Sequence, residues 1–134
     1  MKGKTTVAEF DQTVLDAAAR EREVELTTWG RVSGQPSRVI IWIWGDGRHL
    51  YIRSGAGMRR DWPRNLLARA QGILHLAGRD IPVHARHVDE PAEARAGASW
   101  INHKYGTSLQ PSLDGNHLTP AEQATFELTP ADAS

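Results

Sequence analysis

The sequence predicts a mainly β fold with helices: a Greek-key-like barrel of about six short strands, decorated by about three helices. Two observations carry this prediction. Short stretches with the two-residue alternation of a strand recur between clusters of turn residues. The chain has 134 residues, which suffices for one hydrophobic core and not for two. We therefore expect one domain, with an N-terminal helix in 1–22, a barrel with two inserted helices in 23–129 and a frayed tail in 130–134.

The composition excludes several classes of protein. Hydrophobic residues make up 40% of the chain and charged residues 24%, as in ordinary globular domains. Cysteine is absent, which excludes disulfide scaffolds, thiolate nucleophiles and iron–sulfur sites. The longest apolar run, Val39–Trp44, is far shorter than a membrane span, and the N-terminus has no secretory signal pattern. We therefore expect a soluble, cytoplasmic protein without a transmembrane segment.

The first two elements are a helix and a strand. Over 7–20, apolar residues recur at helical spacing, with acidic residues toward the start. Over 23–29, charged and apolar residues alternate, which is typical of a strand with one wet face. The segment 30–36 that follows is rich in turn residues and separates this strand from the next.

The next two elements form a hairpin. The stretch 38–44 has apolar side chains on both faces, whereas Asp46–Gly47 is a strong hairpin turn and 49–53 returns as the partner strand. A strand buried on both faces is either central in a barrel or covered at a subunit interface. Because a barrel of this size has one interior to fill, we expect the other face to be covered in a homodimer.

A glycine-rich loop, 54–60, leads into the second helix. We expect Asp61 to be the N-cap of this helix and Pro63 to lie in its first turn. The apolar face of the helix comprises Trp62, Leu66, Leu67 and Ala70. After this helix we expect a hairpin of strands 73–76 and 81–88, which turns at Gly78–Arg79. A further helix runs from Asp89 to Tyr105 and is ended by Gly106. The rest of the chain is a long loop or flexible lid over 107–120 and a closing strand at 125–128.

Several chemistries find no support in the sequence. His84 and His87 are the only closely spaced histidines, and an offset of three on a strand points them to opposite faces, so we expect no metal site. The chain has no Gly-x-Ser-x-Gly motif, and Ser54 has no acid and base partners at recognisable spacing, so a hydrolytic triad is not indicated. Nucleic-acid binding is not expected either, because the basic segment has no recognition helix or exposed aromatic platform.

The charge distribution indicates an anion site instead. Between Trp29 and Arg69, eight arginines face two aspartates, although the whole chain has zero formal charge. Two loops in this segment, Gly30–Gly34 and Arg53–Arg60, each combine glycines, a hydroxyl group and guanidinium groups. Such loops let backbone amides approach an anion, and the second loop runs directly into a helix N-terminus. We expect the two loops to converge on one groove.

These residues resemble a known family. The motif Thr-Thr-Trp-Gly-Arg-Val-Ser-Gly-Gln-Pro-Ser-Arg at 27–38, Leu-Tyr-Ile-Arg-Ser-Gly-Ala-Gly at 50–57 and Asp-Trp-Pro-Arg-Asn-Leu at 61–66 are similar to motifs of the deazaflavin-dependent nitroreductases. That family belongs to the FMN-binding split-barrel superfamily, which is related to pyridoxamine phosphate oxidases. The resemblance covers roughly 23–88. The hairpin strands and the ending Lys104-Tyr105-Gly106 also look like an uncharacterised branch of this superfamily.

The resemblance implies a six-stranded split barrel, usually a homodimer, with a flavin-like cofactor near the subunit interface. In the leading hypothesis, reduced coenzyme F420, an 8-hydroxy-5-deazaflavin, passes a hydride to an electron-poor small molecule such as an enone, quinone or nitroarene. The cofactor then carries the difficult chemistry, which is consistent with the absence of a recognisable nucleophile. The alternatives are an FMN-dependent oxidoreductase of the same fold and a non-catalytic, dimeric flavin- or haem-binding module.

The resemblance also implies which residues form the site. The expected cofactor-binding residues are Arg31, Ser33, Arg38, Ser54, Gly55, Gly57, Arg59, Trp62 and Asn65. The expected apolar walls for the ring and substrate are Trp42, Trp44, Trp100 and Tyr105, for which packing is the alternative role. Tyr105 is also the candidate proton donor. Two departures from the family pattern bear on cofactor affinity and identity: Val32 replaces a lysine, and Pro63 follows the tryptophan where an aromatic residue is common.

Overall fold

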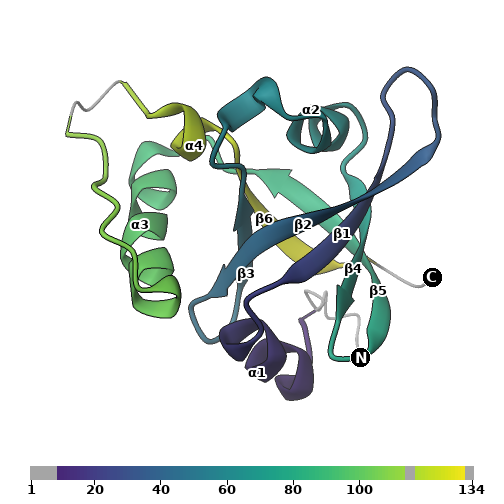
Figure 1. Cartoon of the computed structure of the whole chain (residues 1–134), viewed down its shortest axis with the longest axis horizontal. Coiled ribbons are helices and arrows are strands. Elements are labelled where there is room, and N and C mark those ends of the chain that lie inside the picture. Colours follow the sequence, from purple (N-terminus) through teal and green to yellow (C-terminus); the bar gives the residue numbers. More distant parts are fainter. Residues whose placement is uncertain (1–8, 114–116, 132–134) are drawn as a thin grey trace, which may run out of the picture.

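The computed structural model describes residues 9–113 and 117–131, and their strands form a closed barrel (Figure 1). All neighbouring strands pair antiparallel, and β1 closes the barrel by pairing with β4. The strands in their order around the barrel are β1 (Val24–Trp29), β2 (Pro36–Gly45), β3 (Leu50–Arg53), β6 (Thr125–Pro130), β5 (Arg79–His87) and β4 (Gln71–Leu76). This architecture confirms the predicted mainly β split barrel with helices.

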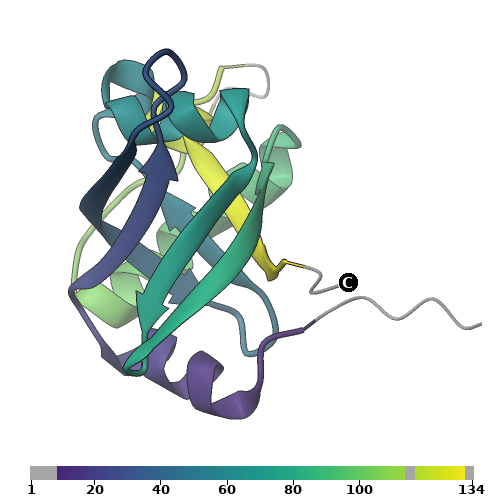
Figure 2. The same cartoon turned by 90° about the vertical axis from the view of Figure 1, so that its right-hand side faces the viewer.

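The helices cover the two ends and one side of the barrel. The helical elements are α1 (Gln12–Arg20), the 3₁₀ turn η1 (Gly57–Arg59), α2 (Asp61–Ala68), α3 (Pro91–Tyr105) and α4 (Pro120–Gln123). Figures 1 and 2 show α1 at one end of the barrel and α2 at the other, while α3 lies along the outside. The helix α3 begins at Pro91 after the cap Glu90, two residues later than the predicted start at Asp89, and it ends at Tyr105 with Gly106 as its C-cap, as the sequence predicts.

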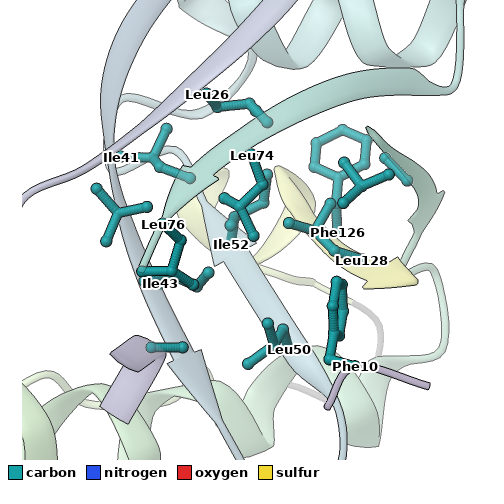
Figure 3. Packing of buried hydrophobic residues seen from close by; sticks show 14 of the residues in the cluster. Phe10, Leu26, Ile41, Ile43, Leu50, Ile52, Leu74, Leu76, Phe126 and Leu128 are labelled. Carbon is teal, nitrogen blue, oxygen red and sulfur yellow. The ribbon is translucent and has the colours of Figure 1, made fainter. Parts of the chain in front are cut away.

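The core fills the barrel because alternate residues of each strand point inward. Figure 3 shows Leu26, Ile43, Ile52, Leu74 and Phe126 meeting in this interior, where all five side chains are fully buried. The helices at the two ends add to the same core, and their buried residues include Val14, Ala17 and Ala18 of α1 and Trp62 and Leu66 of α2. The barrel is therefore closed by helices at both ends.

The outer face of β2 differs from the prediction. Trp44 is buried under α3, beside Ile101 and Tyr105, but Ile40 is 61% exposed and Trp42 is 42% exposed. The expectation that this strand is buried on both faces is therefore wrong for the single chain, because α3 covers only the Trp44 end. The homodimer that would cover the rest stays a prediction.

Local hydrogen bonds move the predicted ends of α1 and α2. The helix α1 starts at Gln12 and not at residue 7, because the Asp11 side chain accepts from the Val14 N–H and caps the helix. In α2, the N-cap is Arg60, not Asp61. Leu67 is half exposed and Ala70 lies beyond the helix, so the buried face of α2 is formed by Trp62, Pro63, Asn65 and Leu66.

The second half of the chain has three further corrections. The β4–β5 turn uses Ala77 and Gly78, both at positive φ, and not Gly78–Arg79. The predicted loop over 107–120 ends in the first residue of a short helix, α4, and residues 114–116 lie outside the described part. The strand β6 continues to Pro130, and the Ala131 N–H donates to Pro82 O at 2.9 Å, so the expected frayed tail concerns only 132–134, which are not described.

Candidate functional site

A groove of about 340 Å³ lies between the β1–β2 turn and the start of α2. In Figures 1 and 2 this turn lies beside α2 at the same end of the barrel. The residues that line the groove are Gly30, Arg31, Val32, Ser33, Gln35, Pro36, Ser37, Asp61 and Asn65. Three of the predicted site residues, Arg31, Ser33 and Asn65, are therefore brought to one place.

Asn65 links the β1–β2 turn to α2. Its side-chain carbonyl accepts from the Arg31 backbone N–H at 3.1 Å and from Arg31 Nη1 at 3.0 Å. Its amide nitrogen donates to Thr28 Oγ1 at 3.2 Å, and Asn65 and Thr28 are both buried. Because Asn65 of α2 bonds both to Arg31 in the β1–β2 turn and to Thr28 of β1, this network holds the Arg31 guanidinium beside α2.

Arg31 also faces Asp61 across the groove. Its Nη1 lies 3.4 Å from Asp61 Oδ1, and the Asp61 side chain is 83% exposed. An exposed ion pair of this length contributes little, about 0–1 kcal/mol, because water and salt screen both charges. An incoming anion can therefore replace the Asp61 carboxylate as the partner of Arg31.

Three further arginines surround the start of α2. Arg59, Arg60 and Arg64 are exposed, and within residues 9–113 and 117–131 none of them forms a hydrogen bond or an ion pair. The N-terminus of a helix carries partial positive charge, which adds to these guanidinium groups. This end of the molecule therefore attracts anions.

The loop that follows β3 contributes no lining residue to this groove, so only the start of α2, and not the loop before it, meets the Gly30–Gly34 turn there. Ser54 is 3% exposed, and its Oγ is the buried side-chain polar atom that lacks a hydrogen-bond partner among the described residues. Gly57, at φ +68, packs against α4, where an added Cβ would lie 2.9 Å from Pro120 Cβ. Gly55 has open space around its Cα. The loop thus offers an unpartnered hydroxyl close to the chain segment that leads into α2.

Arg38 lies elsewhere. Its Nε donates to Glu25 Oε1 at 2.8 Å on the outer face of the barrel, and it lines a different groove from Arg31. Trp62 is buried in the core, with its ring 6.1 Å from that of Phe126, and it does not line the groove at Arg31. The structure therefore separates Arg38 from the other predicted cofactor residues and gives Trp62 a place in the core.

The four predicted aromatic wall residues do not line the Arg31 groove. Trp42 stacks on Tyr105 with ring centroids 4.3 Å apart, and Trp44 stacks on Tyr51 at 5.6 Å. Trp100 is a half-exposed residue on α3. The Tyr105 hydroxyl accepts from the Ile43 N–H and lies at the same distance, 3.2 Å, from Ile43 O. Burial raises the pKa of Tyr105, and these contacts fasten α3 to β2.

A buried arginine was not singled out from the sequence. Arg53 is 8% exposed, its Nε donates to Thr125 Oγ1 at 2.9 Å and its Nη2 donates to Ala94 O. Its guanidinium also lies 5.4 Å from the centroid of the Trp44 ring, and burial lowers its pKa. In the sequence Arg53 is only one of the many arginines of the basic segment. Its position as the last residue of β3, before the glycine-rich loop, is the signal that distinguishes it.

Two other features bear on the predicted chemistry. His84 is exposed, whereas the His87 ring lies 5.3 Å from Phe126, so the two histidines do point to opposite faces of β5. The part of the chain that the structure describes contains no cluster of three or more His, Cys, Asp or Glu side chains suited to a metal ion. No helix in that part is long and apolar enough to cross a membrane.

Solved structures of other proteins share this fold. A protein named F420 reductase is 18% identical in sequence, and its structure superposes with a TM-score of 0.59. The match covers 92% of this chain and 97% of that chain. A putative 5-nitroimidazole antibiotic resistance protein from Bacteroides thetaiotaomicron is 17% identical, with a TM-score of 0.60. That match covers 98% of this chain and 86% of the other. A conserved hypothetical protein from Mycobacterium tuberculosis, Rv2991, is 14% identical, with a TM-score of 0.59 and coverage of 100% and 87%.

These low identities establish the shared fold alone. No curated protein matches the sequence. The family whose pattern matches is described as an uncharacterized protein conserved in bacteria (DUF2255), and the match spans residues 14–128. Because this span includes most of α1 and most of the barrel, through β6, the chain belongs to the DUF2255 family.

Proposed function

We propose that this protein is an oxidoreductase that binds coenzyme F420, with the anionic part of the cofactor held in the groove beside Arg31. FMN is the alternative cofactor. The observation that carries the proposal is the Arg31–Asn65 network at the start of α2, together with the unpartnered Arg59, Arg60 and Arg64. The likeness of the fold to a protein named F420 reductase supports the same assignment.

The residues present fit an anionic group. Besides its hydrogen bond to Asn65, the Arg31 guanidinium has a weak, exposed charged partner in Asp61, and a charge-assisted hydrogen bond to phosphate or carboxylate is stronger than that pair. Gly30 allows the turn to close tightly, because a Cβ there would overlap Ser33 Oγ. The buried Ser54 Oγ lacks a partner among the described residues, so it is a second candidate contact.

In this proposal the cofactor supplies the redox chemistry: when reduced and bound, it donates a hydride to an electron-poor small molecule such as an enone, quinone or nitroarene. Arg31, Asn65 and the arginines of α2 bind and orient it. Trp62 anchors α2 to the core through its contact with Phe126. The exposed Ile40 and Trp42 side chains are the surface that we expect to be covered in a homodimer.

The test is a cofactor titration. Protein purified from a host that makes coenzyme F420 should carry its absorbance and fluorescence spectrum, which differs from that of FMN. Arg31→Ala should weaken F420 binding roughly 10- to 150-fold, because a charged hydrogen bond contributes about 1.5–3 kcal/mol. The matched control is Arg48→Ala, since Arg48 forms an exposed pair with Glu9 and does not line the groove.

Three outcomes decide the proposal. Equal dissociation constants for Arg31→Ala and wild type would remove Arg31 from the site. A melting temperature of the apo protein that falls by more than a few degrees in Arg31→Ala would assign the residue a structural role through Asn65. A wild-type protein that binds neither F420 nor FMN would overturn the proposal and favour the non-catalytic module.

A further inference from the structure

Three side chains form a hydrogen-bonded chain on the outer face of the barrel. Thr27 Oγ1 lies 2.7 Å from His75 Nε2, and His75 Nδ1 lies 2.8 Å from Asp80 Oδ1. The residues belong to β1, β4 and β5, which lie side by side in Figure 2. Thr27 and His75 are partly exposed, so the chain of hydrogen bonds lies at the surface.

The geometry defines the proton positions. A carboxylate only accepts hydrogen bonds, so Asp80 accepts from the Nδ1–H of His75. In the neutral ring Nε2 is then the free acceptor, and the Thr27 hydroxyl donates to it. A hydroxyl donating to an imidazole that a carboxylate holds in one tautomer is the arrangement of an activated nucleophile with its base.

A groove of about 280 Å³ lies against this chain. Its lining residues include His75 and Asp80 of the chain but not Thr27, which lies beside it through the hydrogen bond to His75. The ion pair Arg38–Glu25 and two glutamates of the α1–β1 connection, Glu21 and Glu23, also line the groove. Arg38 is the cross-strand partner of Thr27 in the β1–β2 ladder, so both side chains are on the same face. This groove shares no lining residue with the groove at Arg31.

The charge of the groove favours a cationic ligand. Arg38 is neutralised by Glu25, and Arg79 pairs with Asp11. In the described part of the chain, neither Glu21 nor Glu23 forms a salt bridge, so their carboxylates leave an excess of negative charge along the groove. A small ligand with an ammonium group fits this charge.

We propose that Thr27, His75 and Asp80 form a second site, which hydrolyses small carboxylic esters that carry a positive charge. Thr27 Oγ1 attacks the carbonyl carbon while its proton passes to His75 Nε2. The alcohol leaves with that proton, and the acyl group stays on Thr27. Water, activated by the same nitrogen, then attacks the acyl-threonine, which releases the carboxylic acid and restores the hydroxyl.

The remaining residues have supporting roles in this scheme. The Arg38 guanidinium N–H groups not used by Glu25 are the nearest candidate donors for the developing oxyanion, since Arg38 is opposite Thr27 in the ladder. Asp80 is a positioning residue, because it touches His75 and not the reacting atoms. This assignment explains why Arg38 lies apart from the groove at Arg31, and it does not depend on the cofactor.

The experiment measures acylation of the full-length protein. With p-nitrophenyl acetate as probe, wild type should release p-nitrophenol and acquire one acetyl group at Thr27, located by peptide mass spectrometry. Thr27→Val, which keeps the shape but removes the hydroxyl, should abolish the adduct. His75→Ala should slow acylation about 100-fold or more, as expected for loss of a general base. Asp80→Asn should slow acylation at saturating ester without lowering the melting temperature.

Two controls separate this activity from background and from folding. His84→Ala removes an exposed histidine on the same outer surface of the barrel and should keep the wild-type rate, because free surface imidazoles also react with this probe. Thr27→Ser keeps the hydroxyl and should retain the adduct at position 27 even if Thr27→Val is unstable. Arg31→Ala should keep the esterase rate, so failure of the cofactor proposal leaves this one unaffected.

The proposal is overturned by specific results. A wild-type rate in His75→Ala or in Thr27→Val shows that the three side chains only pair the strands. An acetyl group at another residue, with none at Thr27, gives the same conclusion. For the substrate class, cationic 3-acetoxy-N,N,N-trimethylanilinium should react faster than the anionic aryl ester 3-acetoxybenzenesulfonate, each rate being divided by that of the uncatalysed hydrolysis of the same ester. The reverse order would refute the assignment of a cationic ester.

Discussion

Gly97 of α3 packs against two buried side chains of the barrel, Arg53 and Trp44. A Cβ at this position would lie 2.6 Å from Arg53 Nη2 and 2.8 Å from Trp44 Cζ2. Neither atom can move freely, because Arg53 is held by Thr125 and by the Ala94 carbonyl and Trp44 is 2% exposed. We therefore predict that Gly97→Ala destabilises the protein, although alanine is the better helix former.

The change in the free energy of unfolding caused by Gly97→Ala is the sum of one stabilising and two destabilising contributions. Replacing glycine by alanine inside a helix stabilises by about 0.5–1 kcal/mol. Overpacking a buried site costs about 1–3 kcal/mol, and displacing the Arg53 guanidinium from its hydrogen bonds costs about 1.5–3 kcal/mol. The net loss is about 1.5–5.5 kcal/mol, which corresponds to a fall in melting temperature of roughly 5–20 °C for a domain of this size.

The assay is thermal and urea unfolding of the variant beside a matched control. Ser99→Ala changes an exposed position of the same helix and should stabilise slightly, by about 0.5 kcal/mol, because only helix propensity is altered. An Arg53→Ala background removes one of the two close contacts and leaves that with Trp44, so the cost of Gly97→Ala should shrink without disappearing. A Gly97→Ala protein as stable as wild type would refute the close packing of α3 against Arg53.

Two further predictions concern buried hydrogen bonds. Burial disfavours the Glu122 carboxylate, but the hydrogen bonds from the N–H groups of Thr119 and Ser112 outweigh burial and lower the pKa of this group. The carboxylate therefore contributes its full stabilisation at pH values above the ordinary pKa of 4.5, and this contribution disappears as the pH falls below that value. Glu122→Gln should cost about 1–3 kcal/mol at pH 7 and less at pH 3, measured by urea unfolding, and an equal cost at both pH values would contradict this. Tyr105→Phe should lose about 1–2 kcal/mol through the bonds to Ile43 while Trp42 stays stacked. A redox rate that falls 100-fold at unchanged stability would instead make Tyr105 a proton donor.

The strands, the Asp46–Gly47 turn and the C-terminal end of α3 were predictable because their signals are local. Alternation along 23–29 and the Asp46–Gly47 turn require no knowledge of the rest of the chain, and Asp46 does accept from the Arg48 and His49 N–H groups. Helix ends were less predictable. Asp61 has the residue type of an N-cap, yet in the structure it faces Arg31, a residue 30 positions away, and Arg60 is the cap.

The candidate site was partly predictable because some of its residues lie in short motifs that can be recognised locally in the sequence. Arg31, Ser33 and Asn65 belong to two short motifs, and the structure brings both motifs to one groove. Arg38 follows the first motif closely in sequence, but it is on β2, where alternation puts it on the outer face with Ile40 and Trp42. The strand β2 begins at residue 36, earlier than the sequence predicts, so Arg38 lies within the paired part of the strand. Its side chain is then on the same outer face as that of Glu25, to which it donates.

The sequence by itself determined the class of fold, the order of its strands and the basic character of one segment, since each depends on residue type and short spacing. Only the tertiary structure decided which side chains meet. Strand register places His75 beside Thr27, 48 positions away, and the closed barrel brings Arg53 under α3. These contacts depend on how strands pair and how helices pack across long loops, and no local pattern records a register between distant strands.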